Sequence, residues 1–317
     1  MASASLKEAE CPQALPDIPT EDHVCALELS SGAWVEARGR VYGPVGAPAI
    51  IVLGGISAHR FLLGDHAERQ GWWPGIAGPG LALDPLNTRL LAYDFLADEV
   101  SPYPSVDDQA EALLALADAA GLDRFRIVGS SYGGMIALAL AAKAGPRVTR
   151  LDVLCAADRA HPMSTALRSV QRDIVRFALA RGDGAGGVDL ARRIAMTTYR
   201  TAEEFADRFR NPEPGSRDCD GVEAYLAARG SDYAARTSPQ RFLALSCSMD
   251  SVAVDVSQIS APTRILAIDE DRLVPLCDIE AMAARFPDAS LTRISSLYGH
   301  DAFLKETGQV AAFLTTP

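Results

Sequence analysis

One short segment constrains the fold of this 317-residue chain more than any other. Residues 129–133 read Gly-Ser-Ser-Tyr-Gly, a G-x-S-x-G pentapeptide with Ser131 at its centre. A short strand candidate, residues 126–128, precedes the pentapeptide, and an apolar helical run at 135–142 follows it. Glycines two residues before and after the serine leave room for a tight turn between strand and helix. The segment therefore predicts a serine nucleophile at a helix N-terminus, where the helix dipole favours developing negative charge.

Strand and helix patterns alternate along most of the chain, which indicates an α/β fold with a mostly parallel sheet. The predicted strands are residues 26–29, 34–42, 49–53, 90–93, 151–154, 263–267 and 291–294. A helix is predicted over residues 105–121, with Ser105 as its N-cap and Asp108 placed for a near capping box. The last predicted helix covers residues 303–313.

Beyond residue 158 the strand signals vanish, and charge-rich helical segments follow one another. We therefore expect an all-helical insertion that acts as a lid. The N-terminal residues are polar and punctuated by prolines, which is typical of a loose arm. The expected division is a flexible arm at residues 1–20, an α/β core at 21–157 and 246–317, and a helical lid at 158–245.

The composition excludes several classes of partner. With 30 Lys and Arg against 41 Asp and Glu, the net charge is −11, so nucleic acid is not an expected partner. No apolar run approaches the about 18 residues of a membrane span, and no cationic and apolar leader begins the chain. The six cysteines include no pair at C-x-x-C spacing. We expect a cytoplasmic protein with reduced thiols, without a metal site and without membrane contact.

A serine hydroxyl needs a base before it can act as a nucleophile. In chains with this nucleophile turn the partners follow in the order serine, acid, histidine. Only His161 and His300 come after Ser131, and His161 comes too early to follow an acid-bearing strand. His300, in the loop after the last predicted strand, is therefore the predicted base.

Three consecutive carboxylates, Asp269, Glu270 and Asp271, follow the penultimate predicted strand. We choose Asp271 as the acid, because the Leu-Val-Pro that follows it would pin the loop and start a helix. Its role would be to hold the histidine tautomer and to stabilise the imidazolium. Asp269 stays as the alternative acid, and Glu270 is expected to face solvent.

An oxyanion hole needs two backbone N–H groups. One should come from Tyr132, directly after the nucleophile. The other should come from the loop after the strand at 49–53, where two glycines precede Ile56. Gly55 or Ile56 is the expected second donor, because glycine allows a backbone to approach a substrate closely.

Three segments together resemble the homoserine O-acyltransferases of the α/β-hydrolase superfamily. They are SYGGM at 131–135, DRLVP at 271–275 and GHDAFL at 299–304. Residues 71–84 are similar to that family's segment after the oxyanion loop, and residues 191–199 to its lid helix. The resemblance covers roughly residues 50 to 305. It implies the α/β-hydrolase fold, a mostly parallel central sheet flanked by helices with an inserted all-helical lid.

The resemblance also implies site residues. Ser131, Asp271 and His300 would form the triad. Arg192, Tyr199 and Asp301 would hold an amino-acid substrate. Their chemistry agrees with this role, because a guanidinium binds a carboxylate with two hydrogen bonds and a carboxylate can pair with an ammonium.

The activity implied is transfer of an acyl group from acyl-CoA, with acetyl-CoA favoured, to the hydroxyl of L-homoserine, a step of methionine biosynthesis. The expected mechanism is ping-pong through an acyl-serine, with acyl-CoA as co-substrate and no permanently bound cofactor. A homodimer that forms through the lid is a further expectation.

Other functions stay open at this point. The donor could be succinyl-CoA, whose extra carboxylate would need a cation such as His59 or Arg60. The acceptor could be serine, one methylene shorter than homoserine. A carboxylesterase or other hydrolase of the same fold, and a non-catalytic binding protein, are the remaining alternatives.

Overall fold

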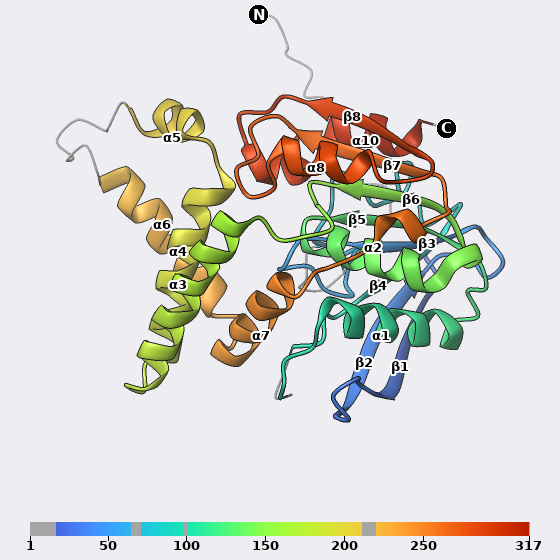
Figure 1. Ribbon diagram of the computed structural model, residues 1–317, viewed down its shortest axis with the longest axis horizontal. Helices are drawn as coiled ribbons and strands as arrows, with labels where there is room; N and C mark the ends of the chain where they lie inside the picture. The colour runs from blue at the N-terminus through green and yellow to red at the C-terminus, as the bar shows by residue number, and fades with distance from the viewer. Residues whose placement is uncertain (1–16, 65–70, 98–100, 211–219, 317) are drawn as a thin grey trace, which may run out of the picture.

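The computed structural model describes residues 17–64, 71–97, 101–210 and 220–316, around a central eight-stranded sheet (Figure 1). The strand order is β1-β2-β4-β3-β5-β6-β7-β8. β1 and β2 form an antiparallel pair, β2 joins β4 antiparallel, and all further neighbours are parallel. This confirms the predicted mostly parallel sheet. The strands are β1 (Thr20–Glu28), β2 (Trp34–Tyr42), β3 (Ala49–Leu53), β4 (Arg89–Tyr93), β5 (Phe125–Ser130), β6 (Val148–Leu154), β7 (Thr263–Ile268) and β8 (Ala289–Ile294).

Helices cover both faces of the sheet, because alternate residues of the buried strands point to opposite sides. On one face Ile51 and Leu53 pack with α1, α2 and α8, and on the other Ile50 and Val52 pack with α10 and Trp73. The helices of the core are α1 (Val106–Ala119), α2 (Tyr132–Ala144), α8 (Leu276–Ala283), α9 (Ala302–Lys305) and α10 (Thr307–Thr315). The capping box expected at Ser105 forms, with Asp108 as its second member.

The first strand differs from its prediction. β1 begins at Thr20, six residues before the predicted start, because each residue from Thr20 to Glu28 pairs with β2. This is a largely exposed edge strand, so its sequence carries little apolar alternation. Most of the expected arm, residues 1–16, lies outside the described residues.

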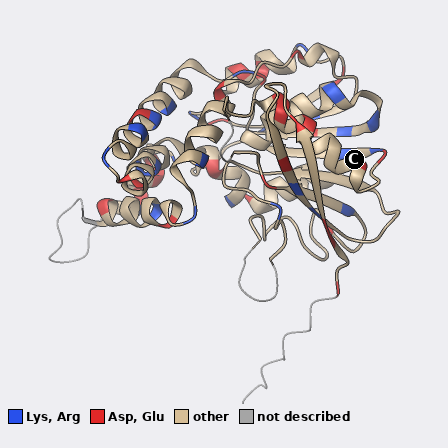
Figure 2. Ribbon diagram, turned by 90° about the horizontal axis from the view of Figure 1, so that it is seen from below, with Lys and Arg blue, Asp and Glu red and all other residues tan. Residues whose placement is uncertain are grey.

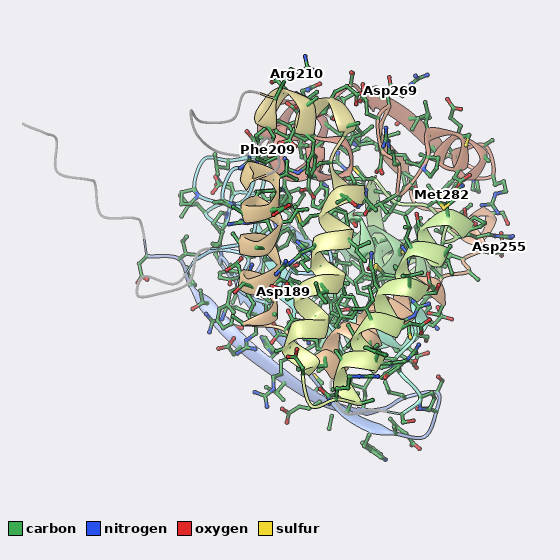
Figure 3. The ribbon with its side chains drawn as sticks, turned by 90° about the vertical axis from the view of Figure 1, so that its left-hand side faces the viewer. Asp189, Phe209, Arg210, Asp255, Asp269 and Met282 are labelled. Carbon is green, nitrogen blue, oxygen red and sulfur yellow. The ribbon has the colours of Figure 1, made fainter. Side chains whose placement is uncertain are left out.

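In the described part of the segment between β6 and β7 there are five α-helices, which stand together beside the sheet (Figure 1). They are α3 (Pro162–Leu179), α4 (Gly184–Tyr199), α5 (Ala202–Phe209), α6 (Asp220–Ala234) and α7 (Pro239–Asp250). The helical stretch thus continues past residue 245, to the end of α7. Side-by-side packing of α3 and α4 is visible in Figure 3, and a separate small core around Val175 and Tyr233 joins them to α6 and α7. Basic and acidic residues intermix along the ribbon of these helices (Figure 2), as expected for exposed helices.

The predicted catalytic residues follow the carboxyl ends of the parallel strands and therefore lie at one edge of the sheet. Gly54 follows β3, Ser131 follows β5, Asp271 comes shortly after β7 and His300 follows β8. Ligand sites of open α/β sheets form at this edge. Within the described part of the chain, no helix combines the length and the apolar character that crossing a membrane requires.

Candidate active site

Ser131 occupies a strained turn between β5 and α2. Its φ of 53° and ψ of −123° are uncommon for a residue with a side chain, and such strain costs about 1–3 kcal/mol. The flanking glycines are required by space, because a Cβ on Gly129 would lie 2.5 Å from Cβ of Ala137 and one on Gly133 2.5 Å from the carbonyl oxygen of Gly54. The Gly133 amide donates to the Gly54 carbonyl at 2.9 Å, which ties this turn to the loop after β3.

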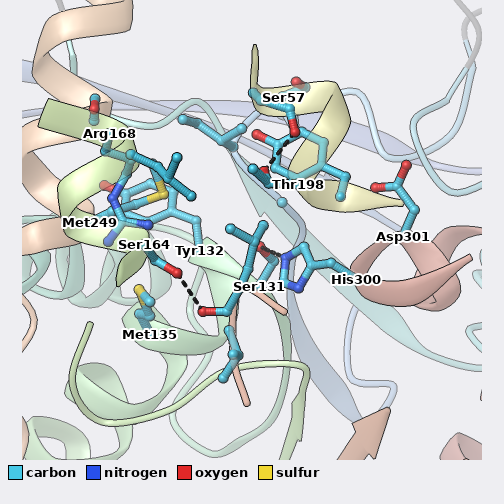
Figure 4. Close-up of a pocket in the computed structure, with 18 of the residues that line it drawn as sticks. Ser57, Ser131, Tyr132, Met135, Ser164, Arg168, Thr198, Met249, His300 and Asp301 are labelled. Atoms are coloured by element: carbon cyan, nitrogen blue, oxygen red, sulfur yellow. Dashed lines mark hydrogen bonds between the residues drawn. The ribbon is translucent and has the colours of Figure 1, made fainter. Parts of the chain in front are cut away.

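Three side chains form a continuous hydrogen-bonded relay at this turn. Oγ of Ser131 lies 2.7 Å from Nε2 of His300, and Nδ1 of His300 lies 2.6 Å from Oδ2 of Asp271 (Figure 4 shows the first of these contacts). The other oxygen of Asp271 accepts the amides of Leu273 and Val274, at 2.8 and 3.0 Å. These two amides hold the carboxylate against the imidazole. The arrangement can remove the proton of a serine hydroxyl.

The environment of His300 alters its basicity. Burial disfavours its charged form, but the charge of Asp271 and its hydrogen bond to Nδ1, with a smaller contribution from Asp301, outweigh the burial. The pKa of His300 is therefore raised above its ordinary value. A raised pKa makes the neutral imidazole a stronger base, which suits proton removal from serine.

The two neighbouring carboxylates have other partners. Asp269 forms an exposed ion pair with Arg293, at 2.9 Å, and lies at the outer edge of the molecule (Figure 3). Glu270 does not face solvent freely as expected, since its carboxylate accepts the Ser295 hydroxyl and the Ser296 amide. Neither carboxylate contacts the imidazole of His300.

The expected oxyanion donors line the same cavity as the serine. Gly55, Ile56 and Tyr132 all line it, and a Cβ on Gly55 would lie 3.9 Å from Cβ of Ser131. Within the described residues, no acceptor takes the amides of Ile56 and Tyr132. The Tyr132 hydroxyl instead donates to Oγ of Ser248 at 2.8 Å. The hydroxyl of Tyr132 is therefore engaged elsewhere, and its backbone amide is the group that can donate to an oxyanion beside Ser131.

Arg192 brings a positive charge into the cavity. Its Nη1 lies 3.4 Å from the Tyr199 hydroxyl, and its guanidinium lies 4.6 Å from the ring centre of Tyr233. No carboxylate pairs with Arg192 in the described ranges of the chain. The Tyr199 ring lies 6.1 Å from the His300 ring, so the cavity places this cation near the relay.

Asp301 also lines the cavity, but it already has a partner. Nε of Arg200 donates to Oδ2 of Asp301 at 2.8 Å, and Nη1 of Arg200 lies 3.5 Å from Glu204. Arg200 was not among the residues predicted for the site, although it directly follows Tyr199. Two side chains of α3 in the cavity wall, Arg168 and Gln171, were not among them either.

The other histidines and cations that the sequence offered for this site, as far as they are described, do not contact Ser131 or His300. His161 caps the N-terminus of α3 through the Met163 amide and lies in the cavity wall. His59 and Arg60 line a neighbouring groove, and Arg60 pairs with Asp94, so the expected extra cations lie outside the cavity of Ser131. Among the described residues, no three His, Cys, Asp or Glu side chains are grouped as a metal site requires.

The chain is similar to known proteins of one family. Residues 48–307 match the α/β hydrolase fold family. The homoserine O-succinyltransferase of Xanthomonas campestris pv. campestris is 41% identical over 286 residues, which cover 88% of this chain and 78% of that protein. The homoserine O-acetyltransferase of Deinococcus radiodurans is 31% identical, over 92% of this chain and 88% of that protein.

The chain belongs to the homoserine O-acyltransferase family of α/β hydrolases. Members of this family are O-acyltransferases, and the arrangement of Ser131, His300 and Asp271 is typical of the fold. A crystal structure of homoserine O-acetyltransferase from Bacillus anthracis has the same fold, with a TM-score of 0.84 at 16% identity, covering 94% of this chain and 98% of that one.

Proposed function

We propose that this enzyme transfers an acyl group from an acyl-CoA to the side-chain hydroxyl of L-homoserine, through an acyl-serine intermediate. One observation carries the proposal. The Ser131–His300–Asp271 relay opens into a cavity that also holds Arg192, a guanidinium without a carboxylate partner in the described residues. A nucleophile beside a free cation suits an amino-acid acceptor, and relatives named for homoserine support the choice.

In the first half-reaction Nε2 of His300 takes the proton of Ser131 while Oγ attacks the thioester carbonyl. The amide of Tyr132 and that of Gly55 or Ile56 bind the oxyanion of the tetrahedral intermediate. The carbon–sulfur bond then breaks, and His300 returns the proton to the thiolate of CoA. The step leaves an acyl ester on Ser131.

In the second half-reaction the homoserine hydroxyl gives its proton to His300 and attacks the acyl ester. Arg192 binds the α-carboxylate of the acceptor, and the tyrosine hydroxyl of Tyr199 adds a polar contact. Asp301, held by Arg200, presents its second oxygen to the α-ammonium. The proton returns to Oγ as the ester bond to Ser131 breaks. Helices α3–α7 act as the lid that limits water, which favours transfer over hydrolysis.

The Arg192→Ala variant tests this assignment of the acceptor site. Acylation of Ser131 needs no homoserine, so a group that contacts only the acceptor should affect only the second half-reaction. We expect acylation at the wild-type rate and discharge to homoserine slowed about tenfold to hundredfold, because a hydrogen-bonded ion pair is lost. Mass spectrometry of the acyl-enzyme, followed in time after mixing with each substrate, measures both half-reactions.

Arg193→Ala is the matched control, since Arg193 is the next residue of α4 and pairs with Asp189. It should leave both half-reactions unchanged. Equal slowing of acylation and discharge by Arg192→Ala would contradict an acceptor-specific role. Discharge of the wild-type acyl-enzyme by water as fast as by homoserine would favour a hydrolase, and faster discharge by serine would change the acceptor.

We further infer a homodimer formed through the lid helices. Met163, Val170 and Phe177 are 60%, 54% and 61% exposed and follow one another at seven-residue intervals on α3. Such a stripe packs against a helix of a second copy. Val170→Asp should therefore convert dimer to monomer in light scattering, while Gln258→Asp, on the exposed η2 turn (Val256–Gln258) of the core, should not. A wild-type protein with monomer mass at micromolar concentration would contradict the inference.

A further inference from the structure

Two arginines share one carboxylate behind the cavity of Ser131. Nε and Nη2 of Arg168 lie 2.8 and 2.5 Å from Oδ1 of Asp250, and Nη1 of Arg172 lies 2.6 Å from Oδ2. All three side chains are largely buried. Buried charges are normally balanced by partners, because an uncompensated charge away from water is costly. This cluster carries one positive charge in excess.

The excess charge faces the cavity. Ser164, Arg168 and Gln171 are spaced at i, i+4 and i+7 on α3, which puts them on one face of the helix, and all three line the cavity of Ser131. Nη1 of Arg168 has no hydrogen-bond partner within the described part of the chain. Figure 4 shows Arg168 and Asp301 on opposite sides of Ser131.

Gln171 supplies an independent observation. Gln171 is only 5% exposed, it lines the cavity, and its side-chain amide makes no hydrogen bond to any described residue. Most protein amides with so little exposure are hydrogen-bonded within the protein, whereas this one is left for whatever occupies the cavity. A cavity-lining amide one helical turn from an excess guanidinium is suited to bind an anion.

A purely structural role explains only part of this cluster. The ion pairs of Asp250 with both arginines hold α3 against α7. A hydrogen bond from Arg172 to the Ser246 carbonyl adds to this helix–helix interaction. Helix anchoring explains neither the second positive charge nor a Gln171 amide without a partner among the described residues. The charge of Arg168 also reaches the relay, since it acts to lower the pKa of His300. An anion bound at Arg168 would therefore lie close to the reacting serine.

We propose that Arg168 and Gln171 bind the terminal carboxylate of a dicarboxylic acyl group, so that the donor is a succinyl-CoA type of thioester. This rests on the proposed function, because it names the acyl group that Ser131 accepts. The terminal carboxylate of a succinyl group lies two methylenes from the carbonyl that Ser131 attacks. The acceptor site at Arg192, Tyr199 and Asp301 stays separate, so each substrate carboxylate has its own cation.

This assignment departs from the acetyl donor that the sequence analysis favours. An acetyl group has no terminal carboxylate, so Nη1 of Arg168 and the Gln171 amide would gain no partner from it in the acyl-enzyme. The terminal carboxylate of a succinyl group can accept hydrogen bonds from both. The relative from Xanthomonas campestris, named for succinyl transfer, is consistent with this choice.

The test compares kcat/KM for succinyl-CoA and acetyl-CoA, with the acyl-serine adduct identified by mass spectrometry. The wild-type enzyme should prefer succinyl-CoA. Gln171→Leu removes the amide at similar volume, and Arg168→Gln removes the charge, so each should lower the succinyl-to-acetyl ratio about tenfold to hundredfold. Arg176→Gln makes the same change on the exposed face of α3 and should leave the ratio unchanged.

The outcomes separate this inference from the proposed function. A wild-type preference for acetyl-CoA, or equal losses with both donors in both variants, would overturn the donor assignment and leave acyl transfer intact. If Arg168→Gln is succinylated at the wild-type rate but discharges to homoserine more slowly, Arg168 belongs to the acceptor site. That result would also overturn the donor assignment. Absence of an acyl-serine adduct with either thioester would contradict the proposed function itself.

Discussion

Ser131→Ala should eliminate the acyl-enzyme and lower turnover about 10⁶-fold. The variant removes the only oxygen that His300 can deprotonate in the relay, at 2.7 Å from Nε2, so no covalent intermediate forms. Alanine replaces serine without added volume, so the strained turn and the packing around it should persist. Mass spectrometry after mixing with the acyl-CoA measures the adduct, and thermal unfolding measures whether the protein stays folded.

Ser130→Ala is the matched control for this variant. Ser130 is the neighbouring buried serine, and its hydroxyl contacts the Leu53 carbonyl at 3.4 Å instead of the imidazole. It should keep both the adduct and most of the turnover. Acyl transfer near the wild-type rate in Ser131→Ala would remove this serine from the mechanism.

Asp271→Asn should lower turnover about 10⁴-fold. The carboxylate accepts the proton of Nδ1 of His300, at 2.6 Å, and so keeps Nε2 free to accept the serine proton. An asparagine amide that donates to Nδ1 would hold the wrong tautomer. The amides of Leu273 and Val274 would still fix the side-chain carbonyl, so the geometry should persist while the chemistry fails.

The pH profile gives a second readout for the same variant. Neutral His300 is the active base, so kcat/KM rises as the pH rises through its pKa, which the charge of Asp271 raises. Loss of that charge lowers the pKa, and the rising limb should move to lower pH. Asp269→Asn is the control and should change little, because Asp269 pairs with Arg293 at the surface. The reverse ranking of the two variants would assign the acid to Asp269.

The sequence alone was enough to predict the catalytic residues whose positions depend on a short stretch of chain. The G-x-S-x-G turn excludes side chains at Gly129 and Gly133 by direct contact, so its pattern is visible in five residues. His300 followed from chain order and from the scarcity of histidines. The alternation of strands and helices likewise comes from residue patterning within short windows, and the mostly parallel sheet confirms it.

Tertiary structure decided the charge partners. Arg200 pairs with Asp301, 101 residues away, and Arg168 pairs with Asp250, 82 residues away. Such pairs depend on how the inserted helices pack against each other and against the loop after β8, and no short pattern contains that information. Packing also decides that, within the described ranges, the Gln171 amide has no protein partner and Arg192 has no carboxylate partner. A polar side chain is available to a ligand when packing leaves it facing a cavity and supplies no protein partner.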